Sequence, residues 1–255
     1  MYHNKSVSVV LATYREKKSI KKAIEDFFSS GFIDEVIVVD NNSEKGTIEE
    51  VCKTKATIIQ EKRQGYGIAY QTGIKKAKGN FVVLCEPDGS YRAEDIEKFL
   101  IYADSGFDAV FGSRTEESAP FSKSEMNFWR KYTNVFEAKT IELLFNSNSL
   151  TDVGCTYKLL TRGAIKKLSK HWKIKNSLFA TELILLTITQ KVKFIEILIV
   201  FKKRIGKSSL TDTWFKLVKW GTYIQIFIIF FFLNNLVKSL YSETFSVDNK
   251  VETVK

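Results

Sequence analysis

The sequence predicts an α/β fold: a mostly parallel β-sheet with helices on both faces. Three observations lead to this prediction. Short apolar runs rich in Val and Ile alternate with amphipathic stretches through the first 115 residues. The runs are almost continuously apolar, which is typical of strands buried on both faces. The stretches between them are long enough for the crossover helices that parallel strands require.

The first strand is expected at 7–12 (VSVVLA), and apolar residues at helical spacing predict a helix over 17–30, ended by Gly31. The same alternation then repeats. Further strands are expected at 35–39, 56–59, 81–85 and 108–112, and further helices at 47–53, 67–77 and 93–103. In the second half, helices are expected at 126–145, 179–189 and 214–237, with a last strand at 194–201.

The composition is that of a folded protein. With 255 residues, the chain can form one large domain or one domain with an appendage. A charged fraction of 27% and a hydrophobic fraction of 44% exclude wholesale disorder. The first six residues are polar and the apolar run after them is too short for a signal-peptide core, so we expect a cytoplasmic protein.

Cysteine and histidine usage restricts the metal chemistry. Cys52, Cys85 and Cys155 are widely spaced and form no CxxC pair, so neither a disulfide framework nor a thiolate zinc site is expected. Only two histidines are present. Any bound metal would therefore be a hard cation, such as Mg²⁺ or Mn²⁺, held by carboxylates.

The net charge of +10 is unevenly distributed. Between Lys158 and Trp220 there are fifteen Lys and Arg residues against three acids. This asymmetry favours a polyanionic partner, either nucleic acid, anionic lipid headgroups or a phosphorylated substrate. The alternative is a lysine-rich surface that only contacts water. Nucleic-acid binding is supported by charge alone, without a motif, and is not expected.

Polar clusters directly follow three of the predicted strands. They are 13–16 (TYRE), 40–42 (DNN) and 86–88 (EPD). In a sheet of helix-linked parallel strands, ligands bind at the carboxyl ends of the strands, so these clusters are candidates for a binding site. The alternative is that the Asp and Asn side chains only cap the helices that follow, above all at 42–43.

Glu86 and Asp88 indicate a cation site. Alternate residues of an extended segment face the same side, so the two carboxylates converge and repel each other unless a cation lies between them. The segment RQGYG at 63–67 opens a predicted helix and allows a phosphate or sugar to approach its glycines. The GxGxxG, GxxxxGK[ST] and GxSxG motifs are absent, which argues against dinucleotide binding, P-loop hydrolysis and α/β-hydrolase chemistry.

Seven segments occur in the order found in one known family. They are VSVVLATYRE, EVIVVDNNS, RQGYGIAYQTGIKKAKG, FVVLCEPDGSY, FGSRT, TDVGCTYKLLTR and FIEILIVFKKRIGKSSL. Together, over residues 6–210, they resemble a family 2 glycosyltransferase and are most similar to the polyprenyl-phosphate (dolichol-phosphate) sugar transferases. The resemblance implies the GT-A nucleotide-diphospho-sugar transferase fold.

The resemblance also implies roles for the strand-end clusters. Glu86 and Asp88 occupy the D-x-D positions of the family, with Asp88 binding Mg²⁺ or Mn²⁺. The chain departs from the family pattern in having Glu at the first of these positions, and Asn41 where a second Asp often follows Asp40. The nucleotide of the donor would be held or bordered by Thr13, Tyr14, Glu16, Asp40, Arg63 and Gly65.

Acceptor chemistry has two alternatives. A lipid phosphate is already ionised and needs cations rather than a base. A saccharide hydroxyl needs a carboxylate to take its proton, for which Asp152 is the candidate, although Asp152 could instead cap a helix or pair with Lys158. The candidates for binding an acceptor phosphate are Arg114, Arg130, Arg204, Lys207 and Ser208, of which the last three lie in a stretch that resembles the basic acceptor loop of the family.

The C-terminal region indicates contact with a membrane. The apolar core at 223–233 (YIQIFIIFFFL) is shorter than the roughly 20 residues that a spanning helix needs. Lys and Trp residues precede it, which is typical of a cytoplasmic membrane interface. We expect a helix at 211–238 that lies on the inner face of the membrane or mediates homo-oligomerisation, with a short span as the alternative, and a disordered tail at 239–255.

These observations predict an inverting, metal-dependent glycosyltransferase. It would move a sugar from a UDP- or GDP-linked donor to a polyprenyl phosphate. The alternative uses the same donor with a saccharide hydroxyl acceptor, in polysaccharide or glycolipid synthesis. Residues 1–115 would form the nucleotide-sugar-binding half and residues 116–210 the acceptor-binding half of one domain.

Overall fold

A seven-stranded sheet forms the centre of the part of the chain that the computed structural model describes, which is residues 1–115, 128–206 and 213–251. The strand order is β3-β2-β1-β4-β6-β5-β7. All paired strands run parallel except β6, which is antiparallel to both β4 and β5. The strands are β1 (Val7–Thr13), β2 (Glu35–Asp40), β3 (Thr57–Gln60), β4 (Phe81–Cys85), β5 (Ala109–Ser113), β6 (Lys158–Thr161) and β7 (Phe194–Leu198).

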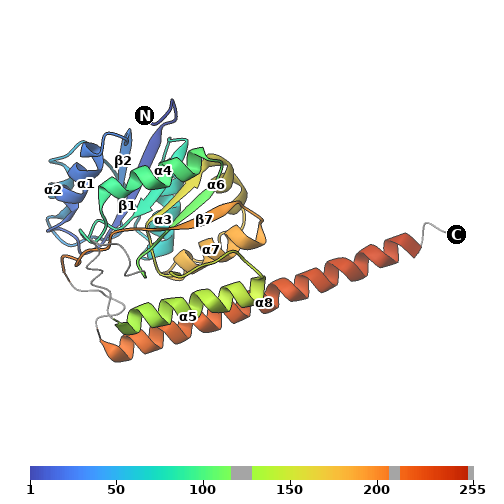
Figure 1. Ribbon diagram of the computed structural model, residues 1–255. Helices are drawn as coiled ribbons and strands as arrows, with labels where there is room; N and C mark the ends of the chain where they lie inside the picture. Colours follow the sequence, from blue (N-terminus) through green and yellow to red (C-terminus); the bar gives the residue numbers. More distant parts are fainter. Residues whose placement is uncertain (116–127, 207–212, 252–255) are drawn as a thin grey trace.

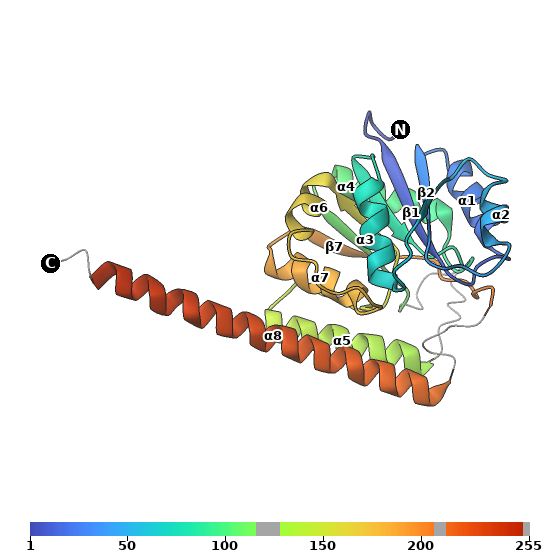
Figure 2. The same cartoon turned by 180° about the vertical axis from the view of Figure 1, so that it is seen from behind.

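Helices cover both faces of this sheet (Figures 1 and 2). The predicted α/β fold with a mostly parallel sheet is thus confirmed. The helices are α1 (Ile20–Ser29), α2 (Thr47–Val51), α3 (Tyr66–Lys76), α4 (Ile96–Asp104) after a short 3-10 turn η1 (Ala93–Asp95), α5 (Phe128–Phe145), α6 (Arg162–Leu168), α7 (Phe179–Thr189) and α8 (Trp214–Val251).

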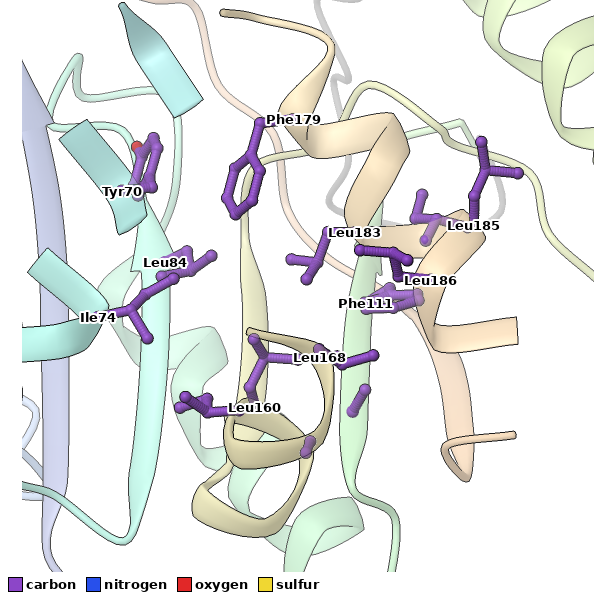
Figure 3. Packing of buried hydrophobic residues seen from close by; sticks show 14 of the residues in the cluster. Tyr70, Ile74, Leu84, Phe111, Leu160, Leu168, Phe179, Leu183, Leu185 and Leu186 are labelled. Atoms are coloured by element: carbon purple, nitrogen blue, oxygen red, sulfur yellow. The ribbon is translucent and has the colours of Figure 1, made fainter. Parts of the chain in front are cut away.

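The alternation of side chains along the strands creates two apolar cores. In β1, Val9 packs with α1 and α4 on one face, while Val10 packs with α3, α6 and α7 on the other. Figure 3 shows the second core, in which side chains from α3, α6 and α7 meet those of the sheet. Gly73 allows α3 to lie directly on the sheet, since a Cβ at this position would overlap the side chain of Val10.

Two elements were not predicted from the sequence, β6 and the short helix α6. Strand β6 has only four residues and begins with Lys158, whose fully buried ammonium donates a hydrogen bond to the carbonyl oxygen of Cys155. A charged residue at the start of so short a run hides the strand pattern. The last strand also ends earlier than predicted, at Leu198 rather than at 201.

Helices α5 and α8 lie side by side below the sheet (Figure 1). Trp129 contacts Trp214 near their starts, with ring centroids 4.8 Å apart, and Phe145 contacts Phe232 further along, at 5.4 Å. The two helices therefore run parallel. Residues 214–238 of α8 are long and apolar enough to cross a membrane by length and composition.

The prediction of a disordered tail over 239–255 is wrong for 239–251, which continue α8 as a helix. The physical reason is that no Gly or Pro interrupts the chain between Thr222 and Val251, so nothing local ends the helix after Asn234 and Asn235. Residues 252–255 lie outside the described residues.

Candidate active site

An open cavity of about 840 Å³ lies at the carboxyl ends of β1, β2 and β4. Its walls are the segments that follow these strands, the start of α3, one face each of α5 and α8, and the 201–206 segment. A cavity of this size is in the range of small-molecule sites. The predicted site residues that line it are Thr13, Tyr14, Glu16, Gly65, Glu86, Asp88, Arg114, Arg130 and Arg204.

The other predicted site residues lie elsewhere. Asp40, Arg63 and Asp152 do not line the cavity. Each is within two residues, along the chain, of a residue that does. Lys207 and Ser208 fall outside the described residues.

Glu86 and Asp88 share one cationic partner. The Nη2 atom of Arg204 lies 2.7 Å from Asp88 Oδ2 and 3.2 Å from Glu86 Oε2. The other oxygen of Asp88 accepts hydrogen bonds from the backbone N–H (2.9 Å) and hydroxyl (2.5 Å) of Ser90. Ser90 therefore fixes the Asp88 carboxylate with Oδ2 toward the cation. The guanidinium occupies the position that two converging carboxylates offer to a positive charge.

Glu86 is held from the opposite side by a short chain of hydroxyl groups. Thr156 donates to Glu86 Oε1 (2.9 Å), and the hydroxyl groups of Thr156 and Tyr66 are 2.7 Å apart. Burial raises the pKa of Glu86 to about 7; the charge of Asp88 adds to this shift and Arg204 opposes it. Within residues 1–115, 128–206 and 213–251, no group of three or more His, Cys, Asp or Glu side chains is arranged to hold a metal.

The loop after β1 is organised by Glu16. One carboxylate oxygen of Glu16 accepts hydrogen bonds from the Thr13 hydroxyl (3.1 Å), the Tyr14 N–H (2.7 Å) and the Arg15 N–H (2.8 Å). This arrangement leaves Tyr14 partly exposed at the cavity. Thr13, Tyr14 and Glu16 are thus brought together, as the sequence predicts for residues that follow the first strand.

Asn41 connects the end of β2 to the 61–65 loop. Its amide donates to the carbonyl oxygens of Glu61 and Arg63 (both 2.8 Å) and accepts from the Gly65 N–H (2.8 Å). Gly65 has φ +153°, and a Cβ there would lie 2.5 Å from the carbonyl oxygen of Lys175, so only glycine fits. The Asn41 amide therefore shapes the part of the cavity that borders α3. An Asp at this position could not donate hydrogen bonds to the two carbonyl oxygens.

Asp40 and Arg63 are engaged within these loops. Asp40 Oδ1 accepts from the Ser43 N–H at 2.8 Å, which matches the alternative reading that this cluster caps local backbone. The Arg63 guanidinium donates to both oxygens of the buried Glu61 (2.8 and 2.7 Å) and Thr72 donates to Glu61 as well (2.7 Å).

This Glu61 cluster predicts an acid-sensitive contribution to stability. Hydrogen bonds from Arg63, and from Thr72 in addition, lower the pKa of Glu61 from 4.5 to about 2 against the opposing effect of burial. A depressed folded-state pKa stabilises the protein above the unfolded value, and the stabilisation is lost as the pH falls from about 4.5 toward 2. Because the Arg63 side chain is largely exposed and screened by solvent, we expect this contribution to the free energy of unfolding to be no more than about 1 kcal/mol.

The test compares urea unfolding of the wild type and Glu61→Gln at several values between pH 3 and pH 6. The wild type is expected to be more stable at pH 6, and the difference should shrink toward pH 3. A difference that does not depend on pH would contradict the ionised state of Glu61.

Asp152 forms a buried ion pair with Arg114. Asp152 is 0% exposed, and its two oxygens accept from Arg114 Nε (2.7 Å) and Nη2 (2.8 Å) and from the Arg114 N–H (3.0 Å). Burial alone would raise the pKa of Asp152, but the Arg114 guanidinium outweighs it and lowers the pKa. The partner is Arg114 and not Lys158. Both oxygens are used internally, so this geometry does not offer a base to an acceptor hydroxyl.

Three guanidinium groups lie around the same part of the cavity. Burial lowers the pKa of Arg130, and the positive charges of Arg114 and Arg204 lower it further. Arg114 also lies over the ring of Phe201, 5.1 Å from its centroid. The charged form of Arg130, which neighbouring cations disfavour, is stabilised when an anion binds beside it.

Several lining residues were missed by sequence reasoning. Thr156 and Tyr66 lie in segments of the family resemblance, but the resemblance implies no role for them, and Asn41 stands out in the sequence only as a departure from the family pattern. Glu137 lies in the predicted 126–145 helix among many aromatic and aliphatic residues, which hides it in the sequence. Its spacing of seven residues after Arg130 was the available signal. Further missed lining residues are Gln64, Tyr91, Asn134 and Asn176.

The family model described as glycosyl transferase family 2 matches residues 8–169. The chain belongs to this family. A dolichyl-phosphate hexose transferase of Haloferax volcanii is 31% identical over 115 residues, 44% of this chain and 50% of that protein. The dolichyl-phosphate beta-glucosyltransferase ALG5D of Trichomonas vaginalis is 26% identical over 211 residues, 75% of this chain and 64% of that protein. The family 2 chain thus spans 50% and 64% of the lengths of these two relatives.

Solved structures show the same fold. The family 2 chain matches glucosyl-3-phosphoglycerate synthase of Mycobacterium tuberculosis, solved with Mn²⁺, UDP and glucosyl-3-phosphoglycerate, with a TM-score of 0.67 at 14% identity. The match covers 91% of this chain and 80% of that one. The expected GT-A type of fold is therefore confirmed. The region that the family model matches, residues 8–169, includes the Glu86–Asp88 segment but not the 201–206 segment or α8.

Proposed function

We propose that this protein is an inverting, metal-dependent glycosyltransferase that moves a sugar from a nucleotide-diphosphate sugar to a polyprenyl phosphate. One observation carries the proposal: two acids and three arginines from distant parts of the chain line one cavity, beside a pair of helices with a large exposed apolar surface. The donor would lie along the β1, β2 and α3 side. The acceptor phosphate would lie on the arginine side.

The acidic pair fits a divalent cation. Asp88 Oδ2 and Glu86 Oε2 both face the same positive group, Arg204, and hard oxygen ligands together with substrate phosphates are what Mg²⁺ and Mn²⁺ favour. When bound, such an ion stabilises the charge that develops on the departing nucleoside diphosphate. Ser90 keeps Asp88 oriented for this task before the donor arrives.

Arg204, Arg130 and Arg114 would bind the acceptor phosphate. A phosphate monoester is ionised at neutral pH, so it attacks the anomeric carbon without a general base, and the arginines have only to bring its charge close to the donor. Attack opposite the leaving group inverts the anomeric configuration. The engagement of both Asp152 oxygens by Arg114 favours this acceptor over a saccharide hydroxyl.

The α5–α8 pair would dock the enzyme on the membrane that contains its acceptor. Exposed apolar and aromatic side chains on both helices support this, since extended apolar surface that is exposed to solvent marks interaction sites. We place the protein at the cytoplasmic face, and homo-oligomerisation through α8 is the competing use of the same surface. The exposed residues include Trp129, Tyr132, Phe136, Leu143, Trp214, Phe215, Tyr223, Ile226, Phe230 and Leu233.

The test incubates the protein with Mn²⁺ or Mg²⁺, a polyprenyl phosphate in liposomes and radiolabelled UDP-glucose, UDP-N-acetylhexosamines or GDP-mannose in turn. A lipid-linked sugar is expected with one donor and none after chelation by EDTA. Failure with every donor would overturn the lipid acceptor. A thermal-shift screen with UDP and GDP, with and without metal, identifies the nucleotide independently of turnover.

Replacement of Arg204 with Gln is expected to tighten Mn²⁺ binding about tenfold, because the guanidinium competes for Asp88 Oδ2 at 2.7 Å. The same change is expected to raise the KM for polyprenyl phosphate. Titration with Mn²⁺ in the presence of UDP, followed by electron paramagnetic resonance, measures the first effect. Arg92→Gln, which removes a surface cation paired with Glu94, is the control and should change neither value. Unchanged Mn²⁺ affinity in Arg204→Gln would show that the cation does not bind at this carboxylate pair.

A further inference from the structure

The side of α5 that faces the cavity carries a polar stripe. Arg130, Thr133, Asn134 and Glu137 are spaced i, i+3, i+4 and i+7, which places them on one face of the helix, and all four line the cavity. Thr133 donates to the backbone of its own helix (2.8 Å). Asn134 accepts from the Gly154 N–H (2.9 Å) and donates to a helix carbonyl (2.8 Å). These two side chains are therefore committed to the fold.

Glu137 differs from them. It is only 2% exposed, yet its Oε1 atom has no hydrogen-bond partner among the described residues. Burial, with the charge of Asp152 adding to it, raises the pKa of Glu137 to about 9, so the carboxyl is neutral at pH 7 and can both donate and accept. A buried polar group without a partner lowers stability. Its presence on a cavity wall indicates that a ligand supplies the partner.

The wall adjacent to Glu137 is uncharged. Leu217, Trp220, Gly221 and Ile224 of α8 line the cavity, again at helical spacing. A Cβ at Gly221 would lie 3.5 Å from Glu137 Oε1, so the carboxyl lies directly beside this helix at the cavity wall. Burying an anionic phosphate against such a wall is unfavourable, whereas the arginines elsewhere in the cavity match it. The group that meets Glu137 is therefore neutral and polar.

We propose that the Glu137 carboxyl binds a hydroxyl group of a hexose, while the apolar wall of α8 packs against the sugar ring. A hexose suits this position because it combines hydroxyl groups with C–H faces that pack on apolar and aromatic side chains. The inference rests on the proposed function. In transfer to a polyprenyl phosphate the hydroxyl belongs to the transferred sugar, and in transfer to a saccharide it can belong to the acceptor.

Calorimetry of sugar binding tests the proposal. The dissociation constants of UDP and UDP-glucose, and of GDP and GDP-mannose, are measured with Mn²⁺. The Kd of the nucleotide divided by the Kd of its sugar conjugate gives the contribution of the sugar to binding. Glu137→Leu is expected to reduce this ratio about tenfold and to leave the affinity for the nucleotide unchanged. Glu137→Gln keeps a neutral side chain that can both donate and accept a hydrogen bond, so this variant should retain most of the wild-type ratio. Glu142→Gln, on the same helix and paired with Lys139, is the matched control.

The possible outcomes separate the alternatives. An unchanged ratio together with a tenfold higher KM for a saccharide acceptor supports the proposal and assigns the hydroxyl to the acceptor. A higher KM for polyprenyl phosphate alone, or no change in Glu137→Leu, overturns it. A purely structural role would lower the Tm of Glu137→Leu without changing the ratio, whereas we expect a Tm at least equal to that of the wild type. If the wild type binds no nucleotide sugar, the proposed function itself fails.

Discussion

Replacing Asp88 with Asn is expected to lower kcat about 10³-fold while leaving the fold intact. Asp88 Oδ2 is the oxygen aimed at the cation, and Ser90 already satisfies Oδ1. Asn keeps the shape of the side chain but removes the charge that would hold a dication against the donor diphosphate, and such charge stabilisation contributes several kcal/mol to the transition state. Initial rates of lipid-linked sugar formation at saturating donor and metal measure the effect.

Two controls accompany this variant. Asp104→Asn removes a carboxylate that pairs with His3 and Lys5 at the surface, and it should retain the wild-type rate. The Tm of Asp88→Asn shows whether the fold persists. Asp88 also pairs with Arg204, so its replacement could disturb the site in a way unrelated to the metal. The affinity for UDP without metal is therefore measured as well, and we expect it to change little. A rate within tenfold of the wild type would remove Asp88 from the reaction.

Replacing Arg114 with Met is expected to destabilise the protein by about 3–5 kcal/mol, because it leaves the fully buried Asp152 charge without its partner. Two side-chain hydrogen bonds are lost with it. Chemical denaturation at pH 7 measures the change. The double variant Arg114→Met, Asp152→Leu removes both charges and should recover most of the stability, since an apolar pair of similar volume often replaces a buried ion pair without loss.

The two variants also separate folding from function. The double variant is expected to fold and still to bind acceptor phosphate more weakly than the wild type, because one of three arginines is missing. Equal losses of stability in the single and the double variant would mean that Arg114 stabilises the fold through contacts other than Asp152.

The sheet and the acidic side of the site could be predicted from the sequence because both depend on local patterns. β-branched runs marked the parallel strands, and Glu86, Asp88 and Glu16 follow strands directly, where the parallel topology gathers them at one edge. The fold class followed from the same alternation. The family resemblance added the expectation of a metal and a nucleotide.

The basic side depended on contacts that no local pattern encodes. Arg204 reaches Asp88 from more than a hundred residues away, and Arg114, which lines the cavity, also pairs with the buried Asp152. Glu137 lies in a helix with many aromatic residues, so its burial beside α8 became visible only when the two helices were paired. The short antiparallel strand β6 was hidden for the opposite reason, since a buried Lys158 gives it a polar appearance.

The position of Arg204 has a consequence for the sequence of events in a turnover. The Nη2 atom of Arg204 contacts the carboxylates of both Asp88 and Glu86, so this nitrogen is not available to an incoming phosphate while it does so. Arrival of the donor with its dication would release this arginine, and only then would the full cationic set be ready for the second substrate. On the proposed function, Arg204 would thus favour binding of the donor before the lipid acceptor.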